Sequence, residues 1–443
     1  MPEAAARPVS LTLPQTVGQE MVELMRELFP LCRSLTGNGV RETLKILDDV
    51  LPLEVTEVPS GTPIFDWTVP REWNISDAWI ADAEGRRIVD FRESNLHVLG
   101  YSRPVRAVLT GAELQEHLHS VPDHPDWIPV RTAYWADTWG FCVADAQRQA
   151  IEPDARYEVC IDSRLEDGHL TYAEALLPGA SKDEVLLSTY ICHPSLCNDN
   201  LSGIAVLAFA GKHLSGLDLR YSYRFLFSPS TVGPLTWLSR NLDRLDRVRH
   251  GLAVSCVGDA GVVRYKRSRR GTAEIDRAAE HVLRSSRPDA IVDEFVPWGS
   301  DERQFCSPGF DLPFGALTRT PHGLYPEYHS SADDFEIVRA ESLADSLSVL
   351  LEILTVLERN DVCVNRSPCG EPQLGRRGLY REISAGVPRG EEAFQRAILW
   401  VLNLSDGDCS LLDIADRAGI PFGVVADAAD ALRRVNLIER TVE

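Results

Sequence analysis

The sequence predicts an α/β protein with a mainly parallel sheet and helices on both faces, plus a small β-rich inserted domain and a C-terminal winged-helix domain. Strands alternate with helices after residue 156, short segments rich in Pro and Trp precede them, and three short amphipathic helices end the chain. Strand–helix alternation of this kind is typical of parallel sheets covered on both faces. A chain of 443 residues is long enough for two or three domains.

The first part of the chain predicts two different structures. Apolar residues recur at helical spacing within 16–52, on both sides of a break at 36–39, which predicts two helices. From 58 to 156, turn formers separate short alternating segments, which predicts the β-rich insert. We therefore expect residues 1–57 and 157–370 to form one discontinuous α/β domain around that insert.

The α/β domain has a regular series of expected elements. The expected strands are 157–162, 184–191, 221–227, 252–257 and 314–318. The expected helices are 201–213, 233–242, 272–285 and 343–358.

The end of the chain predicts a connector and a winged helix. Residues 361–380 are rich in Pro and Gly and are expected to be a connector, and 376–443 are expected to form the winged-helix-like domain. Its expected elements are helices 392–404, 410–418 and 422–435, followed by a strand from 436. Asp427 and Asp430 in the expected recognition helix would repel phosphate, so packing or partner contact is favoured over DNA binding.

Charge and composition limit the classes of function. The net charge of −21 argues against a general nucleic-acid or anionic-membrane surface. No apolar run approaches the ~20 residues that span a bilayer, and the N-terminus lacks the basic-then-apolar order of a signal peptide, so a cytoplasmic location is expected. The ten cysteines are expected to be reduced. A small-molecule or peptide substrate is the expected partner, with a homo-oligomer left open.

Four side chains form the candidate metal site. His193 ends an apolar run, Asp199 follows six residues later, and Asp259 and His329 also lie beyond apolar runs. Open α/β sheets build their sites at the carboxyl ends of strands, and nitrogen and oxygen ligands suit zinc. The simpler alternative for Asp199 is a helix cap. Cys192 and Cys197 are expected to pack beneath the loop rather than bind metal.

The motif Asn198-Asp-Asn-Leu-Ser-Gly203 resembles the bridging-aspartate motif of the co-catalytic zinc aminopeptidases, the group of aminopeptidase Y and glutamate carboxypeptidase. The resemblance covers roughly residues 157–358 and implies a zinc-exopeptidase-like fold. It implies that His193 and Asp259 bind one zinc, and that Asp199 bridges to a second bound by His329.

The whole chain resembles a bacterial aminopeptidase-like subgroup, often found near polysaccharide or secondary-metabolite genes. The segments that resemble this subgroup are Arg33-Ser-Leu-Thr-Gly, Phe65-Asp-Trp-Thr-Val-Pro, Tyr265-Lys-Arg-Ser-Arg-Arg, Gly299-Ser-Asp-Glu-Arg-Gln-Phe, Glu327-Tyr-His-Ser-Ser-Ala-Asp and Cys369-Gly-Glu-Pro-Gln-Leu-Gly.

The chain departs from the two-zinc pattern at three positions. The resemblance places a Glu-Glu pair, base then ligand, where this chain has Ser230 and Thr231. A hydroxyl cannot accept a proton as a carboxylate can, so Ser230 is a degenerate general-base position. The missing ligand leaves one zinc expected and a second doubtful. Ser195 replaces the family's Asp that orients the first His.

Other residues are candidates for catalysis or substrate contact. Glu302 and Glu327 could supply the base and Asp301 could orient the site, although a surface loop is the alternative for each. A basic run could receive a carboxylate or phosphate, or form salt bridges instead: Lys266, Arg267, Arg269 and Arg270. Four insert aromatics could line the cleft or pack in the core: Trp67, Tyr134, Trp135 and Trp139.

The sequence therefore predicts a zinc-dependent, aminopeptidase-like hydrolase acting on an amide of a small amino-bearing substrate. The alternatives are a non-hydrolytic binding scaffold and a repurposed enzyme that forms an amide in biosynthesis. Phosphate-binding loops, dinucleotide fingerprints, the H-E-x-x-H motif and the nucleophile elbow are all absent from the sequence.

Overall fold

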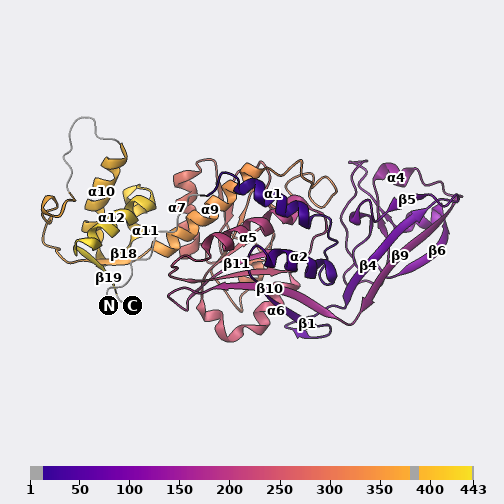
Figure 1. The fold of residues 1–443 in the computed structure, drawn as a ribbon, viewed down its shortest axis with the longest axis horizontal. Coiled ribbons are helices and arrows are strands. Elements are labelled where there is room, and N and C mark those ends of the chain that lie inside the picture. Colours follow the sequence, from indigo (N-terminus) through magenta and orange to yellow (C-terminus); the bar gives the residue numbers. More distant parts are fainter. Residues whose placement is uncertain (1–12, 380–388, 442–443) are drawn as a thin grey trace. The chain divides into compact units, whose positions relative to one another are not determined.

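The computed structural model describes residues 13–379 and 389–441, and contacts within the chain divide it into two compact units (Figure 1). Among the described residues, the first unit contains 13–271 and 291–348, and the second contains 272–290 and 349–441. No helix in these described ranges is long and apolar enough to cross a membrane.

The first unit is built on an eight-stranded sheet. In spatial order its strands are β1 (Glu54–Pro59), β10 (His169–Leu177), β12 (Ser222–Ser228), β11 (Glu184–Tyr190), β13 (Val248–Val254), β16 (Phe314–Thr318), β14 (Arg264–Lys266) and β15 (Ile291–Asp293). The four central strands from β12 to β16 run parallel. Every residue of β11, β12 and β16 is buried, as expected for strands covered on both faces.

Helices cover this sheet as the apolar spacing predicts. Those of the first unit are α1 (Val17–Leu28), α2 (Asn38–Asp48), α5 (Gly203–Leu214), α6 (Val232–Arg240) and α8 (Glu302–Phe305). In Figure 1, α1 and α5 lie on the opposite side of the strands from α6. The buried face of α1 includes Met21, Leu24, Met25 and Leu28, which recur at helical spacing. The two expected N-terminal helices are therefore confirmed.

The insert forms a separate four-stranded antiparallel sheet within the first unit. Its strands, in spatial order, are β5 (Arg87–Asp90), β4 (Glu72–Ala81), β9 (Arg156–Glu166) and β6 (Val105–Thr110). Short elements surround it: β2 (Pro63–Ile64), β3 (Trp67–Thr68), β7 (Leu118–His119), β8 (Phe141–Cys142), α3 (Gly111–Leu114) and α4 (Asp145–Gln149). The 3-10 turns of this unit are η1 (Asn95–His97), η2 (Gln115–His117) and η4 (Leu242–Arg247).

One expected strand belongs to a different sheet. Residues 157–162 were expected to begin the parallel sheet, but β9 pairs with β4 and β6 of the insert. Buried and more exposed residues alternate along β9, which is typical of an antiparallel strand with one solvated face. A central parallel strand would instead be buried throughout. We therefore place the end of the insert at the end of β9.

The four insert aromatics divide into two pairs. Trp139 is 6% exposed and belongs to the hydrophobic core, against which Tyr134 packs. Trp67 and Trp135 are 37% and 60% exposed, with their rings edge to face at 5.7 Å. Core packing therefore accounts for the first pair only.

The second unit contains the winged helix. Its antiparallel sheet has the order β18 (Asp406–Ser410), β17 (Val362–Asn365) and β19 (Ile438–Arg440). Its helices are α7 (Glu274–Ser286), α10 (Arg389–Leu404), α11 (Leu411–Ala418) and α12 (Phe422–Arg434), with the turn η5 (Gly375–Arg377), and α9 (Ala340–Arg359) contributes to both units.

The prediction of a connector at 361–380 is wrong for its first residues, because strand β17 lies there. β17 is the central strand of the winged-helix sheet, because the short apolar run Val-Cys-Val places Cys363 in the core while the backbone pairs on both sides. A run of three apolar residues gives too weak a sequence pattern to distinguish a strand from a loop.

Acidic residues of the winged helix form ion pairs inside the second unit. Asp427 and Asp430 of α12 lie 2.7 Å and 2.8 Å from Arg359. Asp416 of α11 lies 2.8 Å from His281 and 2.7 Å from Arg284 of α7. The carboxylates expected to repel phosphate therefore neutralise cationic side chains of the same unit.

A buried arginine joins three neighbouring strands of the large sheet. Arg224 of β12 is 2% exposed. Its guanidinium donates to both carboxylate oxygens of Glu184 on β11, at 2.7 Å and 2.9 Å, and to Glu174 on β10 at 2.6 Å. Removing one partner of such a buried pair leaves uncompensated charge.

Substituting Arg224→Ala should lower the free energy of unfolding by about 3–5 kcal/mol, since the buried Glu184 carboxylate loses its counter-charge. The matched control is Arg249→Ala, because Arg249 pairs with Asp183 at a surface where their side chains are 58% and 39% exposed; its cost should be about 0–1 kcal/mol. Urea unfolding followed by tryptophan fluorescence measures both. Equal losses in the two variants would contradict the role of the buried pair.

Candidate functional site

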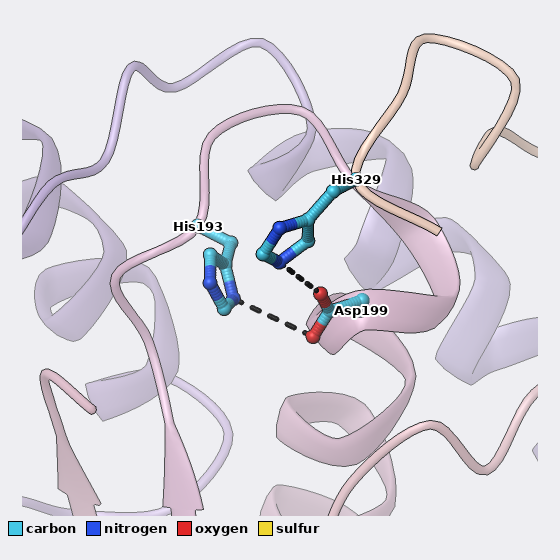
Figure 2. Close-up of side chains that lie close together, drawn as sticks. All are labelled: His193, Asp199 and His329. Atoms are coloured by element: carbon cyan, nitrogen blue, oxygen red, sulfur yellow. Dashed lines mark ion pairs between the residues drawn. The ribbon is translucent and has the colours of Figure 1, made fainter. Parts of the chain in front are cut away.

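Three side chains far apart in the sequence meet at the carboxyl ends of the parallel strands (Figure 2). His193 follows β11, Asp199 lies in the helical turn η3 (Cys197–Ser202) before α5, and His329 lies in the loop after β16. His193 Nδ1 is 3.5 Å from Asp199 Oδ1, and His329 Nε2 is 3.0 Å from Asp199 Oδ2. Their possible ligand atoms all lie within 4.8 Å of one another.

The donor atoms of this cluster fit a metal ion. His193 Nδ1, Asp199 Oδ2 and His329 Nε2 are buried and have no hydrogen-bond partner among the described residues. Buried polar atoms are normally paired, and two imidazoles with one carboxylate form a ligand set that suits zinc. Asp199 is not the cap of α5, because the residue at that position is Ser202.

Unusual backbone conformations occur in all four loops around the cluster. Ser195, Thr231, Cys256 and His329 have φ of 31°, 63°, 50° and 56° and follow β11, β12, β13 and β16 in turn. A non-glycine residue in this region costs of order 1 kcal/mol and persists where the surrounding structure fixes it. The loops are therefore held in place rather than free.

Asp333 fixes the backbone that carries Asp199. Its buried carboxylate accepts hydrogen bonds from the amides of Asn198 at 2.6 Å and Asp199 at 3.0 Å, and from the Tyr325 hydroxyl at 3.0 Å. Burial and the neighbouring Asp199 carboxylate raise the pKa of Asp333 to about 7.

The insert holds the loop that carries His329. The amide of Val130 donates to the His329 carbonyl at 2.8 Å, and the amide of Ser331 donates to the Ile128 carbonyl at 2.8 Å. These bonds flank a bridge between Pro129 and Ser330. Insert residues therefore set the backbone position of a site histidine.

The N-terminal segment holds the loop that carries His193. The guanidinium of Arg33 donates to the His193 carbonyl at 2.8 Å, and the Ser195 hydroxyl donates to the Phe29 carbonyl at 2.7 Å. Ser195 thus serves the backbone of this loop, whereas the Asp expected from the resemblance would orient the imidazole.

The cluster has the protonation states that metal binding needs. Burial lowers the pKa of His193 to about 4, which keeps its imidazole neutral near pH 7. Burial acts to raise the pKa of Asp199, but His193, His329 and His322 outweigh it and hold the pKa well below its ordinary value. A neutral imidazole and an ionised carboxylate are the forms that ligate metals.

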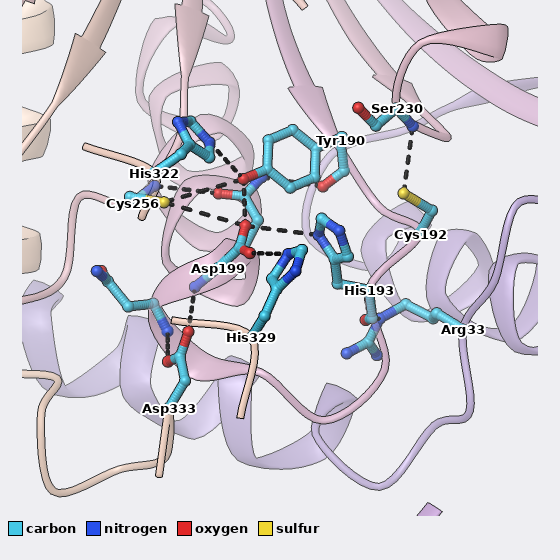
Figure 3. A network of polar contacts seen from close by, with 12 residues as sticks. Arg33, Tyr190, Cys192, His193, Asp199, Ser230, Cys256, His322, His329 and Asp333 are labelled. Carbon is cyan, nitrogen blue, oxygen red and sulfur yellow. Dashed lines mark hydrogen bonds and ion pairs between the residues drawn. The ribbon is translucent and has the colours of Figure 1, made fainter. Parts of the chain in front are cut away.

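A second polar group shares Asp199 with the first (Figure 3). Ligand atoms of Asp199, Cys256 and His322 lie within 4.8 Å of one another, and the Tyr190 hydroxyl donates a short hydrogen bond to Asp199 Oδ1. Neither Cys256 nor His322 is among the site residues expected from the sequence. Both lie just beyond strand ends, the same signal that identified His193, and that signal could have found them.

Asp259 lies outside both groups, although it was expected to bind metal. Its carboxylate accepts from the Asn198 side chain at 2.9 Å, the Gly261 amide at 2.6 Å, and the amide and hydroxyl of Thr320 at 3.1 Å and 2.6 Å. These bonds engage both carboxylate oxygens of Asp259, and it is Cys256, two residues beyond the end of β13, whose Sγ lies 4.0 Å from Asp199 Oδ1.

Asp301 lies beside the degenerate position Ser230. Its Oδ1 accepts from the Ser230 hydroxyl at 3.0 Å and the Thr231 amide at 2.8 Å, and the Ser230 amide contacts Cys192 Sγ at 3.2 Å. Burial raises the pKa of Asp301 to about 6, against the lowering effect of these hydrogen bonds. Asp301 Oδ2 is buried without a partner in the described chain. Asp301, which directly precedes α8, thus places a carboxylate next to Ser230.

The remaining candidates are placed differently. Glu302 is fully buried and forms a short ion pair with Lys266. Glu327 lies two residues before His329 and is partly exposed. The rest of the basic run forms salt bridges: Arg267 with Glu294 at 3.4 Å, and Arg269 and Arg270 with Asp311 at 2.9 Å and 3.4 Å. All ten cysteines are free thiols, and Cys192 and Cys197 are buried.

Comparison with protein families identifies the main part of the chain. Residues 22–360 match a family described as a domain of unknown function, DUF4910, and residues 361–440 match a winged helix-turn-helix family. This chain belongs to the DUF4910 family. The expected winged helix is confirmed.

Two similar proteins span nearly the whole DUF4910 chain. This chain is 50% identical over 422 residues to a candidate polysaccharide biosynthesis protein with an aminopeptidase-like domain from Clostridium acetobutylicum. The match covers 95% of this chain and 96% of the relative. The chain is 48% identical to a candidate peptidase of known crystal structure from the same species, with a TM-score of 0.91 and coverage of 96% and 98%.

A more distant structure shows the type of fold. The zinc aminopeptidase BSAP from Bacillus subtilis has a TM-score of 0.56 at 11% identity, over 77% of the DUF4910 chain and 95% of BSAP. This likeness concerns the fold alone. The predicted α/β architecture is thus confirmed as one shared with aminopeptidases.

The raised pKa of Asp301 predicts a pH-dependent stability of the DUF4910 chain. The pKa of Asp301 in the folded protein is about 6, above the ordinary 3.8. The stability contributed by the protonated carboxyl group is therefore complete below about pH 4 and is lost as pH rises through about 6. Between about pH 4 and pH 7, wild type should therefore lose about 3 kcal/mol of unfolding free energy relative to Asp301→Asn. Denaturant titrations across this range measure it.

Asp137→Asn is the control, because the Asp137 side chain is 90% exposed. Its free-energy difference from wild type should stay nearly constant. A constant difference for Asp301→Asn as well would contradict the raised pKa.

Proposed function

We propose that this chain is a zinc-dependent hydrolase of the aminopeptidase type that cleaves an amide bond in a small, amino-bearing substrate. The observation that supports it most is the convergence of two buried imidazole nitrogens, His193 Nδ1 and His329 Nε2, on the buried Asp199 carboxylate, at 3.5 Å and 3.0 Å. The aminopeptidase-like fold and the aminopeptidase-like relative agree with it.

In this proposal His193, Asp199 and His329 hold one zinc ion and leave a position open. Zinc, when bound, acts as a Lewis acid toward the substrate carbonyl. The protein's own part is to keep the two imidazoles neutral, the carboxylate ionised and the loops fixed, as Asp333, Arg33 and the insert do. A ligand set held in this way loses little entropy when the ion binds.

Asp301 is the base in this proposal. A general base works best with a pKa near the working pH and a free oxygen aimed at its proton. Burial raises the pKa of Asp301 to about 6, and only Oδ1 is engaged by Ser230 and Thr231. Oδ2 would take the proton of the attacking water and later give it to the leaving amine. Ser230 and Thr231 orient the carboxyl group rather than replace the missing glutamates.

A second candidate function is amide formation by the same site. It is favoured by the hydroxyl at Ser230, which departs from the hydrolytic pattern, and by the biosynthetic description of the Clostridium acetobutylicum relative. An amine would then attack the carbonyl of the substrate amide in place of water. Asp301 would accept a proton from that amine and return it to the departing amine, so that one amide bond forms as another breaks.

The metal proposal predicts about one zinc per chain after purification in zinc-containing medium, measured by inductively coupled plasma mass spectrometry. His193→Ala and His329→Ala should each lower bound zinc to roughly a tenth or less at the same free zinc concentration, because each removes one of three protein ligands. His124→Ala is the matched control, since His124 stacks on Trp127 in the insert. Unchanged zinc content in both site variants would contradict the proposal.

The base proposal predicts that Asp301→Asn lowers kcat by roughly 10²–10⁴ while zinc content stays unchanged. A panel of aminoacyl amides, assayed with and without an added amine acceptor, identifies the substrate and separates hydrolysis from amide formation. Asp137→Asn should keep full activity. A variant Asp301→Asn with wild-type kcat would exclude Asp301 as the base, and zinc-loaded wild type inactive on every amide would favour a binding scaffold.

A further inference from the structure

A tyrosine hydroxyl fills the centre of the second group of metal-ligating atoms. Tyr190 is the last residue of β11 and is 2% exposed. Its hydroxyl donates the short hydrogen bond to Asp199 Oδ1, lies 2.9 Å from His322 Nε2 and lies 3.9 Å from Cys256 Sγ (Figure 3). One oxygen atom therefore touches a carboxylate, an imidazole and a thiol at once.

Without this oxygen, the three surrounding groups would form a cation site. Thiolate, imidazole and carboxylate are the usual ligands of zinc and of similar ions. Such an ion lies about 2.0–2.3 Å from each ligand atom, and Asp199, Cys256 and His322 place theirs within 4.8 Å of one another. The space between them is where the Tyr190 oxygen lies, so an ion cannot enter while the hydroxyl stays.

The group has a fixed geometry. Cys256 is fully buried and has a φ of 50°. Its amide donates to Asn200 Oδ1 at 3.3 Å, and its carbonyl accepts from the Arg319 amide at 2.8 Å. A left-handed conformation held from both sides aims the thiol inward toward Asp199.

We propose that the Tyr190 hydroxyl takes the place of a second metal ion and thereby limits the centre to one ion. This inference rests on the proposed function, in which His193, Asp199 and His329 hold that first ion. The phenol occupies Oδ1 of Asp199 and leaves Oδ2, the oxygen beside His329, free for the ion. A second ion held by Asp199, Cys256 and His322 is thus excluded by the hydroxyl that lies among them.

Substituting Tyr190→Phe removes one oxygen and keeps the ring. Asp199 Oδ1 and His322 Nε2 then lose a buried partner, which is unfavourable for both, and a divalent ion can satisfy them together with Cys256. On binding, the Cys256 thiol loses its proton to solvent, as coordinating thiols do.

The test loads the full-length chain with cobalt(II), because ligation of cobalt by a thiolate adds a charge-transfer band in the near ultraviolet. Wild type is expected to bind one equivalent without this band. Tyr190→Phe is expected to bind one more equivalent with the band, and Tyr190→Phe combined with Cys256→Ala is expected to return to the wild-type result. Tyr157→Phe, a buried tyrosine of the insert, is the matched control and should gain no cobalt.

Two results would overturn the inference: Tyr190→Phe that gains no cobalt, or wild type that binds a second equivalent with the sulfur band. If wild type binds no cobalt at all, the proposed metal centre is contradicted. The inference about Tyr190 is not, because the gain in Tyr190→Phe is measured relative to wild type. Should Tyr190→Phe fail to fold, wild type at saturating cobalt decides by itself: absence of the sulfur band supports the inference and its presence overturns it.

Discussion

The candidate site depends on how one buried carboxylate is held. Asp199 has no exposed surface, and a buried charge without partners costs several kcal/mol. Imidazoles lie at both of its oxygens, and Asp333 binds the amides of Asn198 and Asp199 from behind. The direction of the Asp199 side chain therefore follows from main-chain hydrogen bonds, and the two histidines are arranged around it.

Hydrogen bonds to the loops of the candidate site come from two parts of the first unit, the N-terminal segment and the insert. The segment after α1 supplies Arg33 to the loop of His193, and the insert supplies residues 128–130 to the loop of His329. Each histidine is thus positioned by a part of the chain outside the parallel sheet. The β-rich insert therefore supports the backbone of His329 and also forms a sheet of its own.

Two further polar side chains lie next to groups of the candidate site. Asp301 Oδ1 accepts a hydrogen bond from the Ser230 hydroxyl, and burial raises the pKa of Asp301 to about 6. The Tyr190 hydroxyl donates to Asp199 Oδ1 and lies 2.9 Å from His322 Nε2. In the proposals above, the first side chain supplies the general base and the second limits the number of bound ions.

Local patterns in the sequence determined the elements and part of the site. The apolar spacing of α1 and the buried runs of β11 and β16 depend on neighbours along the chain, so they could be predicted. His193, Asp199 and His329 could be identified for the same reason, because each follows the end of a strand. Only the tertiary structure decided that β9 pairs within the insert, that Cys256 rather than Asp259 lies beside Asp199, that the Tyr190 hydroxyl contacts Asp199, and that Asp301 contacts Ser230. Pairing partners and the direction of buried side chains depend on contacts between distant residues, and no local spacing contains that information.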